Sequence, residues 1–184
     1  MRPDEADAVA GRVARLGVAG VVDRPGLFGR LGAARVTVSS APAGSGKTVL
    51  LRSWISHASL RDCAAFVEAG WDPQRFWVSV VGALRRTSTG SELVRALMTA
   101  PDLDGWALVE RLLTDLAPLA EPVWLVVDDV HELGPEVLRQ LELLVMRAPP
   151  ELRFVLAARH DLRLGLHRLR LEGELAEIRA DDLR

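Results

Sequence analysis

The sequence predicts a three-layer α/β/α fold built around a parallel sheet of five strands. Five short segments are rich in apolar and β-branched residues, and several of them are apolar throughout rather than alternating with polar residues. Continuous apolar runs of this kind are typical of strands buried on both faces of a parallel sheet. Segments with helical periodicity lie between them, and this alternation indicates βαβ units with right-handed crossovers.

The expected strands and helices follow one another along the chain. We expect strands at 35–40 (RVTVSS), 63–68 (CAAFVE), 123–129 (VWLVVDD), 152–159 (LRFVLAAR) and 175–179 (LAEIR). Helices are expected from the SGKT segment to about Ser56, over 72–86, over about 103–116 and from Gly134 to just before Pro149. Pro73 and Pro135 support two of these helices because proline favours the first helical position. The stretches at 87–91, 100–105 and 117–122 contain glycine, serine or proline and are expected to be loops.

Composition indicates one ordinary globular domain. The chain has 184 residues, of which 49% are hydrophobic and 26% charged, and its formal net charge is −2. Because 25 acidic residues outnumber 23 basic ones, we expect no direct nucleic-acid binding by this segment. No apolar run approaches the roughly 18 residues of a membrane span, the first residues are too polar for a signal peptide, and the one cysteine excludes an internal disulfide. We therefore expect a soluble, cytoplasmic domain over 1–184, with an N-terminal extension over about 1–20 and no membrane partner.

A glycine-rich segment, APAGSGKT at 41–48, directly follows the first expected strand and precedes an apolar helix. Gly44 and Gly46 allow backbone N–H groups to turn toward phosphate oxygens, and the dipole of the following helix attracts the same anion. Lys47 is the single lysine of the chain and can neutralise phosphate charge, while the Thr48 hydroxyl can bind Mg²⁺. The segment thus predicts a phosphate-binding loop (P-loop) for ATP or ADP with Mg²⁺. Its expected nucleotide contacts are Ala43, Gly44, Ser45, Gly46, Lys47 and Thr48.

One position departs from the usual P-loop pattern, G-x-x-x-x-G-K-S/T, because Ala41 stands where the first glycine is expected. A Cβ atom disfavours positive φ, so the loop has to begin in a conformation that alanine tolerates. The alternative interpretation is a glycine-rich turn that only caps a helix. That alternative does not explain why the chain's single lysine lies here.

An apolar strand that ends in two carboxylates lies further along the chain. Residues 123–129 (VWLVVDD) resemble a Walker B strand. Asp128 is expected to serve the metal site with Thr48, by accepting a hydrogen bond from Thr48 or from a Mg²⁺-bound water, and Asp129 to orient or deprotonate the attacking water. Adjacent strand residues point to opposite faces, so only one of the two acids can face Thr48 without a local twist. Which acid is the base stays open, and Glu132 is a spare candidate.

Arg159 ends the expected strand 152–159, at the edge where ligands bind in open α/β sheets. If this strand lies between the strand before the P-loop and the Walker B strand, the sheet order is 5-1-4-3-2. That order is typical of the additional-strand subclass of P-loop NTPases, and it would place Arg159 to sense the γ-phosphate. The alternative is a surface arginine in an arginine-rich chain.

Histidines and tryptophans are assigned structural roles. The four histidines show no spacing that would bring two of them together, and we expect each to be solvated or to lie at the edge of the core. The five tryptophans lie mostly in segments expected to be apolar helix faces or strand interior. We expect them to belong to the core rather than to stack on bases.

The order of these motifs resembles that of a known family. Over 22–183 the chain contains, in order, VDRP, VTVSSAPAGSGKT, DPQRFW, VWLVVDDVHEL, APPELRFVLAARHD and LRLEGELAEIRADDL. This combination resembles the MalT-like regulators, which are STAND signal-transduction ATPases whose longer members end in a LuxR-type DNA-binding helix-turn-helix. An alanine that opens the P-loop is common in this family.

The resemblance implies a molecular switch that hydrolyses ATP slowly. The ADP-bound protein of this family rests as a closed monomer, while an inducer and ATP favour an open form that associates with itself. Relatives continue into winged-helix, sensor and DNA-binding domains, so we expect this chain to be the nucleotide-binding part of a longer regulator. The implied roles are the adenine region for Arg24 and Pro25, phosphate binding for Gly44 to Thr48, Mg²⁺ and water for Asp128 and Asp129, and the γ-phosphate for Arg159.

Two other function classes stay open from the residues alone. A small P-loop kinase would need an acceptor site and a mobile basic lid, for which Arg163, Arg168 and Arg170 are the nearest candidates. A degenerate interaction module would keep the fold without binding nucleotide. The intact Lys47 and Thr48 argue against the second class.

Overall fold

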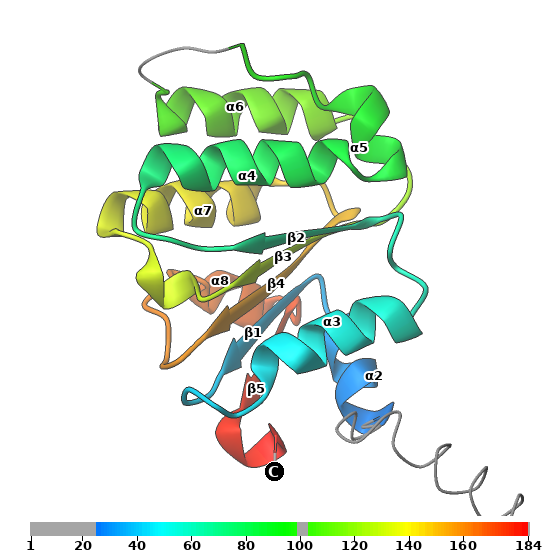
Figure 1. Ribbon diagram of the computed structural model, residues 1–184, viewed down its shortest axis with the longest axis vertical. Coiled ribbons are helices and arrows are strands. Elements are labelled where there is room, and N and C mark those ends of the chain that lie inside the picture. The colour runs from blue at the N-terminus through cyan, green and yellow to red at the C-terminus, as the bar shows by residue number, and fades with distance from the viewer. Residues whose placement is uncertain (1–24, 99–102, 184) are drawn as a thin grey trace, which may run out of the picture.

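Five parallel strands form the central sheet of the computed structural model, which describes residues 25–98 and 103–183 (Figure 1). The strand order is β2-β3-β4-β1-β5, and each neighbouring pair is parallel. Read from the other edge, this is the expected order 5-1-4-3-2, with β4 between β1 and β3. The strands are β1 (Val36–Ser40), β2 (Ala64–Glu68), β3 (Val123–Asp128), β4 (Leu152–Ala158) and β5 (Leu175–Arg179).

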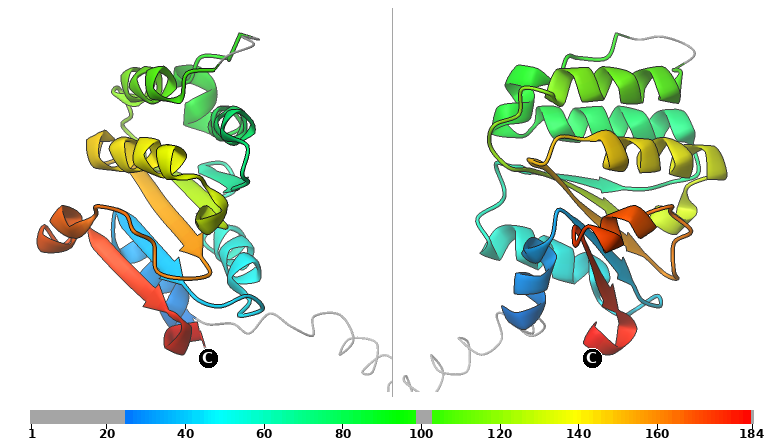
Figure 2. Two further views of the ribbon diagram at one scale, coloured as in Figure 1. Left: turned by 90° about the vertical axis from the view of Figure 1, so that its left-hand side faces the viewer. Right: turned by 180° about the vertical axis from the view of Figure 1, so that it is seen from behind.

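Helices cover both faces of this sheet (Figures 1 and 2). One face carries α2 (Pro25–Ala33) and α3 (Lys47–His57). The other carries α4 (Pro73–Arg85), α6 (Gly105–Leu116), α7 (Pro135–Arg147) and α8 (His167–Leu171). Short elements complete the described chain: α5 (Ser88–Leu93) and the 3₁₀ turns η1 (Val130–Glu132) and η2 (Ala180–Leu183). Within 25–98 and 103–183, no helix is both long enough and apolar enough to cross a membrane.

The starts of the long helices agree with the sequence signals. The Asp72 carboxylate caps α4 by accepting hydrogen bonds from the N–H groups of Gln74 and Arg75, and Pro73 takes the first helical position as expected. Asp104 caps α6 by accepting from the N–H of Trp106. The four expected long helices are therefore confirmed, with ends within a few residues of the prediction.

The stretch 87–91 corrects the sequence analysis, because it belongs to a helix rather than a loop. The Thr87 hydroxyl donates to the carbonyl of Leu84 at 2.6 Å and accepts from the N–H of Gly90 at 3.0 Å. This hydroxyl acts as the N-cap of α5, in a side chain that is fully buried. Small polar residues favour turns and helix caps alike, so composition did not distinguish the two.

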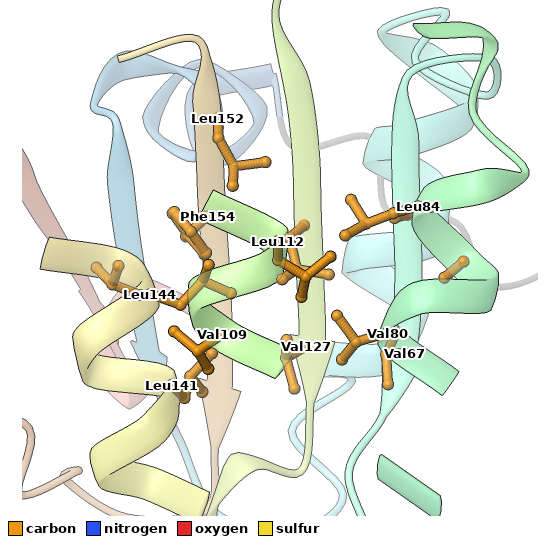
Figure 3. Close-up of a cluster of buried hydrophobic side chains, with 14 of the residues drawn as sticks. Val67, Val80, Leu84, Val109, Leu112, Val127, Leu141, Leu144, Leu152 and Phe154 are labelled. Atoms are coloured by element: carbon orange, nitrogen blue, oxygen red, sulfur yellow. The ribbon is translucent and has the colours of Figure 1, made fainter. Parts of the chain in front are cut away.

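Two hydrophobic clusters lie on opposite faces of the sheet. The larger cluster joins the sheet to α4, α6 and α7, and Figure 3 shows its centre. The smaller cluster lies against α2 and α3. All six residues of β3 are buried, with Leu125 and Val127 in the larger cluster and Trp124 and Val126 in the smaller. This two-sided burial confirms the parallel sheet that the continuous apolar runs predict.

The tryptophans agree with the expectation only in part. Trp54, Trp77 and Trp124 are buried in the core. Trp71 is 84% exposed and Trp106 is 39% exposed. The core assignment was wrong for Trp71 because this residue lies between β2 and the α4 cap, outside the helix face that its neighbours form.

We predict opposite effects from alanine at two glycines. A Cβ atom at Gly90 would lie 1.9 Å from the Leu84 carbonyl oxygen, whereas at Gly82 in α4 its nearest neighbour would be 3.7 Å away. Gly90→Ala should therefore lower the free energy of unfolding by about 1–3 kcal/mol, the usual cost of overpacking. Gly82→Ala should raise it by about 0.5–1 kcal/mol through helix propensity. Urea denaturation of both variants checks this, and equal stabilities would show that α5 does not pack as described.

Candidate nucleotide-binding site

The P-loop connects the end of β1 to the start of α3 at the carboxyl edge of the sheet (Figure 1). Gly44 and Gly46 adopt left-handed backbone conformations, with φ of 77° and 80°. A Cβ atom at either glycine would meet no atom within 4 Å, so glycine is favoured here by backbone conformation and not by crowding. Ala41 is buried and is not among the described residues with positive φ. The loop begins, as expected, in a conformation that alanine tolerates.

The start of α3 presents backbone donors to the loop. Gly46 is the N-cap and makes no side-chain cap hydrogen bond. The N–H groups of the first helical turn are therefore not satisfied by a capping side chain. Such a turn attracts anions through its N–H groups and through the helix dipole.

The Lys47 side chain lies inside this loop and is 7% exposed. Its ammonium donates hydrogen bonds to the carbonyls of Ala41 and Pro42 and contacts the Ser45 hydroxyl, the last two at 3.0 and 3.3 Å. Burial lowers the pKa of Lys47 below its ordinary value. The carboxylates of Asp128 and Asp129 oppose that shift and raise the pKa, so Lys47 lies in the field of the Walker B acids.

A direct hydrogen bond joins the P-loop helix to the Walker B strand. Thr48 Oγ1 donates to Asp128 Oδ2, across 80 residues of sequence. Asp128 is 1% exposed, and its other oxygen accepts the N–H of Asp129 at 2.9 Å. A hydroxyl and a buried carboxylate side by side are hard oxygen donors of the kind that Mg²⁺ prefers, so these two residues fit a magnesium site.

The structure separates the two neighbouring acids. Asp128 ends β3 and faces Thr48, while Asp129 follows in a left-handed conformation with φ of 55°. Its carboxylate is 38% exposed. Asp128 is therefore the acid that faces Thr48, and the backbone changes conformation at the next residue. This agrees with the expectation that the two acids do not both face Thr48 from a regular strand.

Arg159 directly follows β4, which lies between β1 and β3. Its guanidinium is close enough to lower the pKa of Lys47. Its backbone N–H donates to Nδ1 of His131 at 3.3 Å. The fold thus gathers the ends of β1, β3 and β4, and with them the sequence-predicted site residues Lys47, Asp128, Asp129 and Arg159.

Two other predicted contacts are not placed at the site. Arg24 lies outside the described residues, and the structure describes Pro25 only as the first residue of α2. Glu132 lies in η1, where its Oε1 is 3.2 Å from Nε2 of His131. Glu132 therefore contacts His131, the same histidine whose Nε2 lies 4.0 Å from Asp129 Oδ1.

The histidine expectation was wrong for one pair. The rings of His131 and His160 lie 5.6 Å apart between centroids, at an interplanar angle of 67°. They follow β3 and β4, which are neighbours in the sheet. Sequence spacing did not show this because the two strands are far apart in the chain. The signal was their common position just beyond strand ends that meet at one edge.

Glu68 is a residue near the site that the sequence analysis missed. It ends β2 and is the register partner of Asp128. Its carboxylate lies 3.3 Å from the guanidinium of Arg52 in α3. The strand-end rule that selected Arg159 would have selected Glu68 as well.

Comparison with known proteins identifies relatives. A family described as AAA domain matches residues 30–166. The HTH-type transcriptional regulator MalT of Serratia proteamaculans is 30% identical over 154 residues, which are 81% of this chain and 17% of the relative. MalT of Cronobacter sakazakii is 27% identical over 154 residues, with the same two shares. The chain thus spans about 17% of the length of these curated relatives.

Solved structures show the same fold. Cdc6p from Pyrobaculum aerophilum superposes with a TM-score of 0.54 at 16% identity, over 88% of this chain and 46% of that one. A chain of the Drosophila ORC structure with AT-rich DNA and Cdc6 superposes with a TM-score of 0.57 at 12% identity, over 85% of this chain and 51% of that one. At these identities the likeness concerns the fold alone. Since the family match covers most of its length, the chain belongs to the AAA domain family and is a P-loop ATPase domain similar to that of MalT regulators.

Proposed function

We propose that this chain binds ATP and ADP with Mg²⁺ and hydrolyses ATP slowly, as the switch domain of a STAND-type, LuxR-family transcriptional regulator in the cytoplasm. The observation that carries the proposal is the hydrogen bond from Thr48 to Asp128, beside a P-loop whose lysine is buried. A chain that kept the fold for packing alone would gain nothing from placing a lysine, a hydroxyl and a carboxylate at one strand edge.

The P-loop residues account for phosphate binding. Ala43, Gly44, Ser45 and Gly46 provide the turn whose N–H groups surround a phosphate, and α3 adds its dipole. The Lys47 ammonium donates to neutral carbonyls of the loop. Phosphate oxygens are stronger acceptors because their hydrogen bonds are charge-assisted, so the same ammonium would turn to them.

The residues at the ends of β3 and β4 account for hydrolysis. Thr48 and Asp128 would hold Mg²⁺, which when bound neutralises charge on the transferred phosphate. Asp129 has a partly exposed carboxylate beside the buried Asp128, so we assign it the task of orienting the attacking water. Arg159, whose charge acts on Lys47, would place its positive charge at the γ-phosphate.

The switch role rests on the relatives and on the family resemblance. The curated relatives are transcriptional regulators, and this chain matches 17% of their length. We propose that residues 1–184 form the nucleotide-binding domain, with the adenine near Arg24 and Pro25, and that further domains of the parent chain read its nucleotide state. ATP would favour self-association and ADP the closed monomer. In this role the domain remains nucleotide-bound for long periods, so a low turnover rate suffices.

The most direct test identifies the nucleotide that the purified chain carries. Denaturation followed by ion-exchange chromatography should release ADP in an amount close to one per chain. ATP turnover should be slow in a steady-state assay. If the purified chain releases no nucleotide and also fails to bind added Mg-ADP, the degenerate interaction module is favoured. Fast ATP turnover would contradict a switch.

Lys47→Ala should remove most of the affinity for Mg-ADP. The change deletes a charge-assisted contact to phosphate inside a buried loop, which contributes about 2 kcal/mol or more, or roughly 30-fold in Kd. Isothermal titration calorimetry measures the loss. Arg61→Ala is the matched control, since it also removes one cation, from an exposed residue beyond the end of α3. An unchanged Kd for Lys47→Ala would mean that the loop has only a structural role.

The two acids of β3 should show different defects. Asp129→Asn should spare Mg-ADP binding and slow hydrolysis about 100-fold or more, because an amide keeps the shape but cannot accept a proton. Asp128→Asn should instead weaken Mg²⁺-dependent binding by about tenfold or more. Single-turnover assays with and without Mg²⁺ separate the effects, and thermal unfolding checks that Asp128→Asn is folded. Identical defects in the two variants would show that this division of roles is wrong.

A further inference from the structure

His131 occupies the junction between the two strand ends that supply Asp129 and Arg159. It lies in η1, two residues after Asp129, and its side chain is 8% exposed. One edge of its ring faces the chain that leaves β4, and the other faces the carboxylates that follow β3. A titratable side chain that is nine-tenths buried at this junction is not explained by the P-loop mechanism described above.

On the side that faces β4, the ring of His131 accepts one hydrogen bond. Nδ1 of His131 accepts the backbone N–H of Arg159 at 3.3 Å. Because Nδ1 is the acceptor, neutral His131 carries its proton on Nε2. The bond joins the main chain at Arg159 to η1. It therefore limits the positions that the Arg159 guanidinium can reach.

On the side that faces the end of β3, Nε2 of His131 lies between two carboxylates. Nε2 lies 3.2 Å from Glu132 Oε1 and 4.0 Å from Asp129 Oδ1. Within the described residues, this buried nitrogen has no hydrogen bond of good geometry. An unpaired buried donor costs about 1–3 kcal/mol, so a small movement of Glu132 or Asp129 that completed a hydrogen bond to Nε2–H would be favourable.

The neighbouring ring suggests why the histidine keeps its orientation. His160 packs edge-on against His131, and both line a pocket whose other residues are Leu138, Asp161, Leu162 and Arg163. The ring of His131 is thereby held with its two nitrogens toward the two strand ends. A purely space-filling role would need the ring but neither nitrogen.

We propose that His131 is a positioning residue that holds Asp129 and Arg159 in one arrangement around the γ-phosphate, an inference that rests on the function proposed above. Its Nδ1 fixes the Arg159 main chain. Its Nε2–H, 4.0 Å from Asp129 Oδ1, would donate to that oxygen after a small movement of Asp129 and leave the other oxygen for water. His131 itself neither touches nucleotide nor transfers a proton. Removal of either link would disorder the hydrolytic groups and leave the P-loop unaffected.

Three variants of the 184-residue chain separate this role from packing. His131→Leu removes both nitrogens, whereas His131→Asn keeps an acceptor near the position of Nδ1. His160→Phe is the matched control, because it keeps a ring against His131 without nitrogen. We expect His131→Leu to slow single-turnover ATP hydrolysis about 10- to 100-fold, the effect usual for loss of an orienting partner. Its Kd for Mg-ADP should change less than about twofold, since uniform binding is untouched.

The conservative variants supply the decisive comparison. His131→Asn should recover part of the hydrolysis rate, because it keeps the link to the Arg159 main chain and loses the link to Asp129. His160→Phe should match the unchanged protein. Hydrogen exchange at the Arg159 amide, which needs no nucleotide, should be slow in the unchanged protein and in His131→Asn, and at least about tenfold faster in His131→Leu. These results together would support the positioning role.

Other outcomes overturn it in distinguishable ways. Equal hydrolysis rates for His131→Leu and the unchanged protein, or parallel losses of binding, melting temperature and rate without recovery in His131→Asn, would show that His131 only fills space. In both cases the proposed nucleotide function would stand, because Mg-ADP still binds the unchanged protein. If the unchanged protein binds no Mg-ADP, the proposed function itself fails and the positioning role fails with it.

Discussion

The hydrogen bond from Thr48 to Asp128 depends on the whole sheet. It joins the first turn of α3 to the end of β3, and those two points are separated by 80 residues and by an intervening strand, β4. All the strands run parallel, so their carboxyl ends meet at one edge, and a side chain just after one strand can reach a side chain on another. A shift of one residue in the register of β3 would turn Asp128 to the other face of the sheet. Val127 could then take the position that faces Thr48.

The two hydrophobic clusters are what hold that register. Because β3 is buried on both faces, each of its apolar side chains lies either in the cluster with α4, α6 and α7 or in the cluster with α2 and α3. Protein interiors are close-packed and resist small displacements. The packing of the two clusters therefore fixes the positions of the polar residues at the carboxyl edge of the sheet. This difference explains why the described residues of the site come from the P-loop, the first turn of α3 and the ends of strands, while the strand interiors are mostly apolar.

The electrostatics of the edge are a balance between burial and charge. Burial disfavours the charged form of Lys47, and the two aspartates restore part of what burial removes. Arg159 lowers the pKa of Lys47 again, because it is a second cation nearby. A polyanionic phosphate would be attracted by both cations, whereas the aspartates need Mg²⁺ between themselves and the phosphate. Two cations and two acids near one strand edge are thus a charge pattern that a metal–nucleotide pair would complement better than a bare anion.

The sequence by itself determined the class of the fold and the identity of the P-loop and Walker B segments, while the order of the strands was expected on the condition that β4 lies between β1 and β3, which the structure shows. The fold class and these two segments depend on local patterns, namely two-sided apolar strands, glycines that permit positive φ, and a lysine and threonine fixed next to one another by the chain. The sequence already paired Asp128 with Thr48, and the tertiary structure added the left-handed backbone of Asp129, which sets the second acid apart from that pair. The tertiary structure also brought His131 to His160 and to the Arg159 backbone, and turned 87–91 into a helix through the buried hydroxyl of Thr87. The physical reason is that contacts within a motif are set by covalent spacing, whereas contacts between motifs depend on strand register and on which buried polar groups find partners.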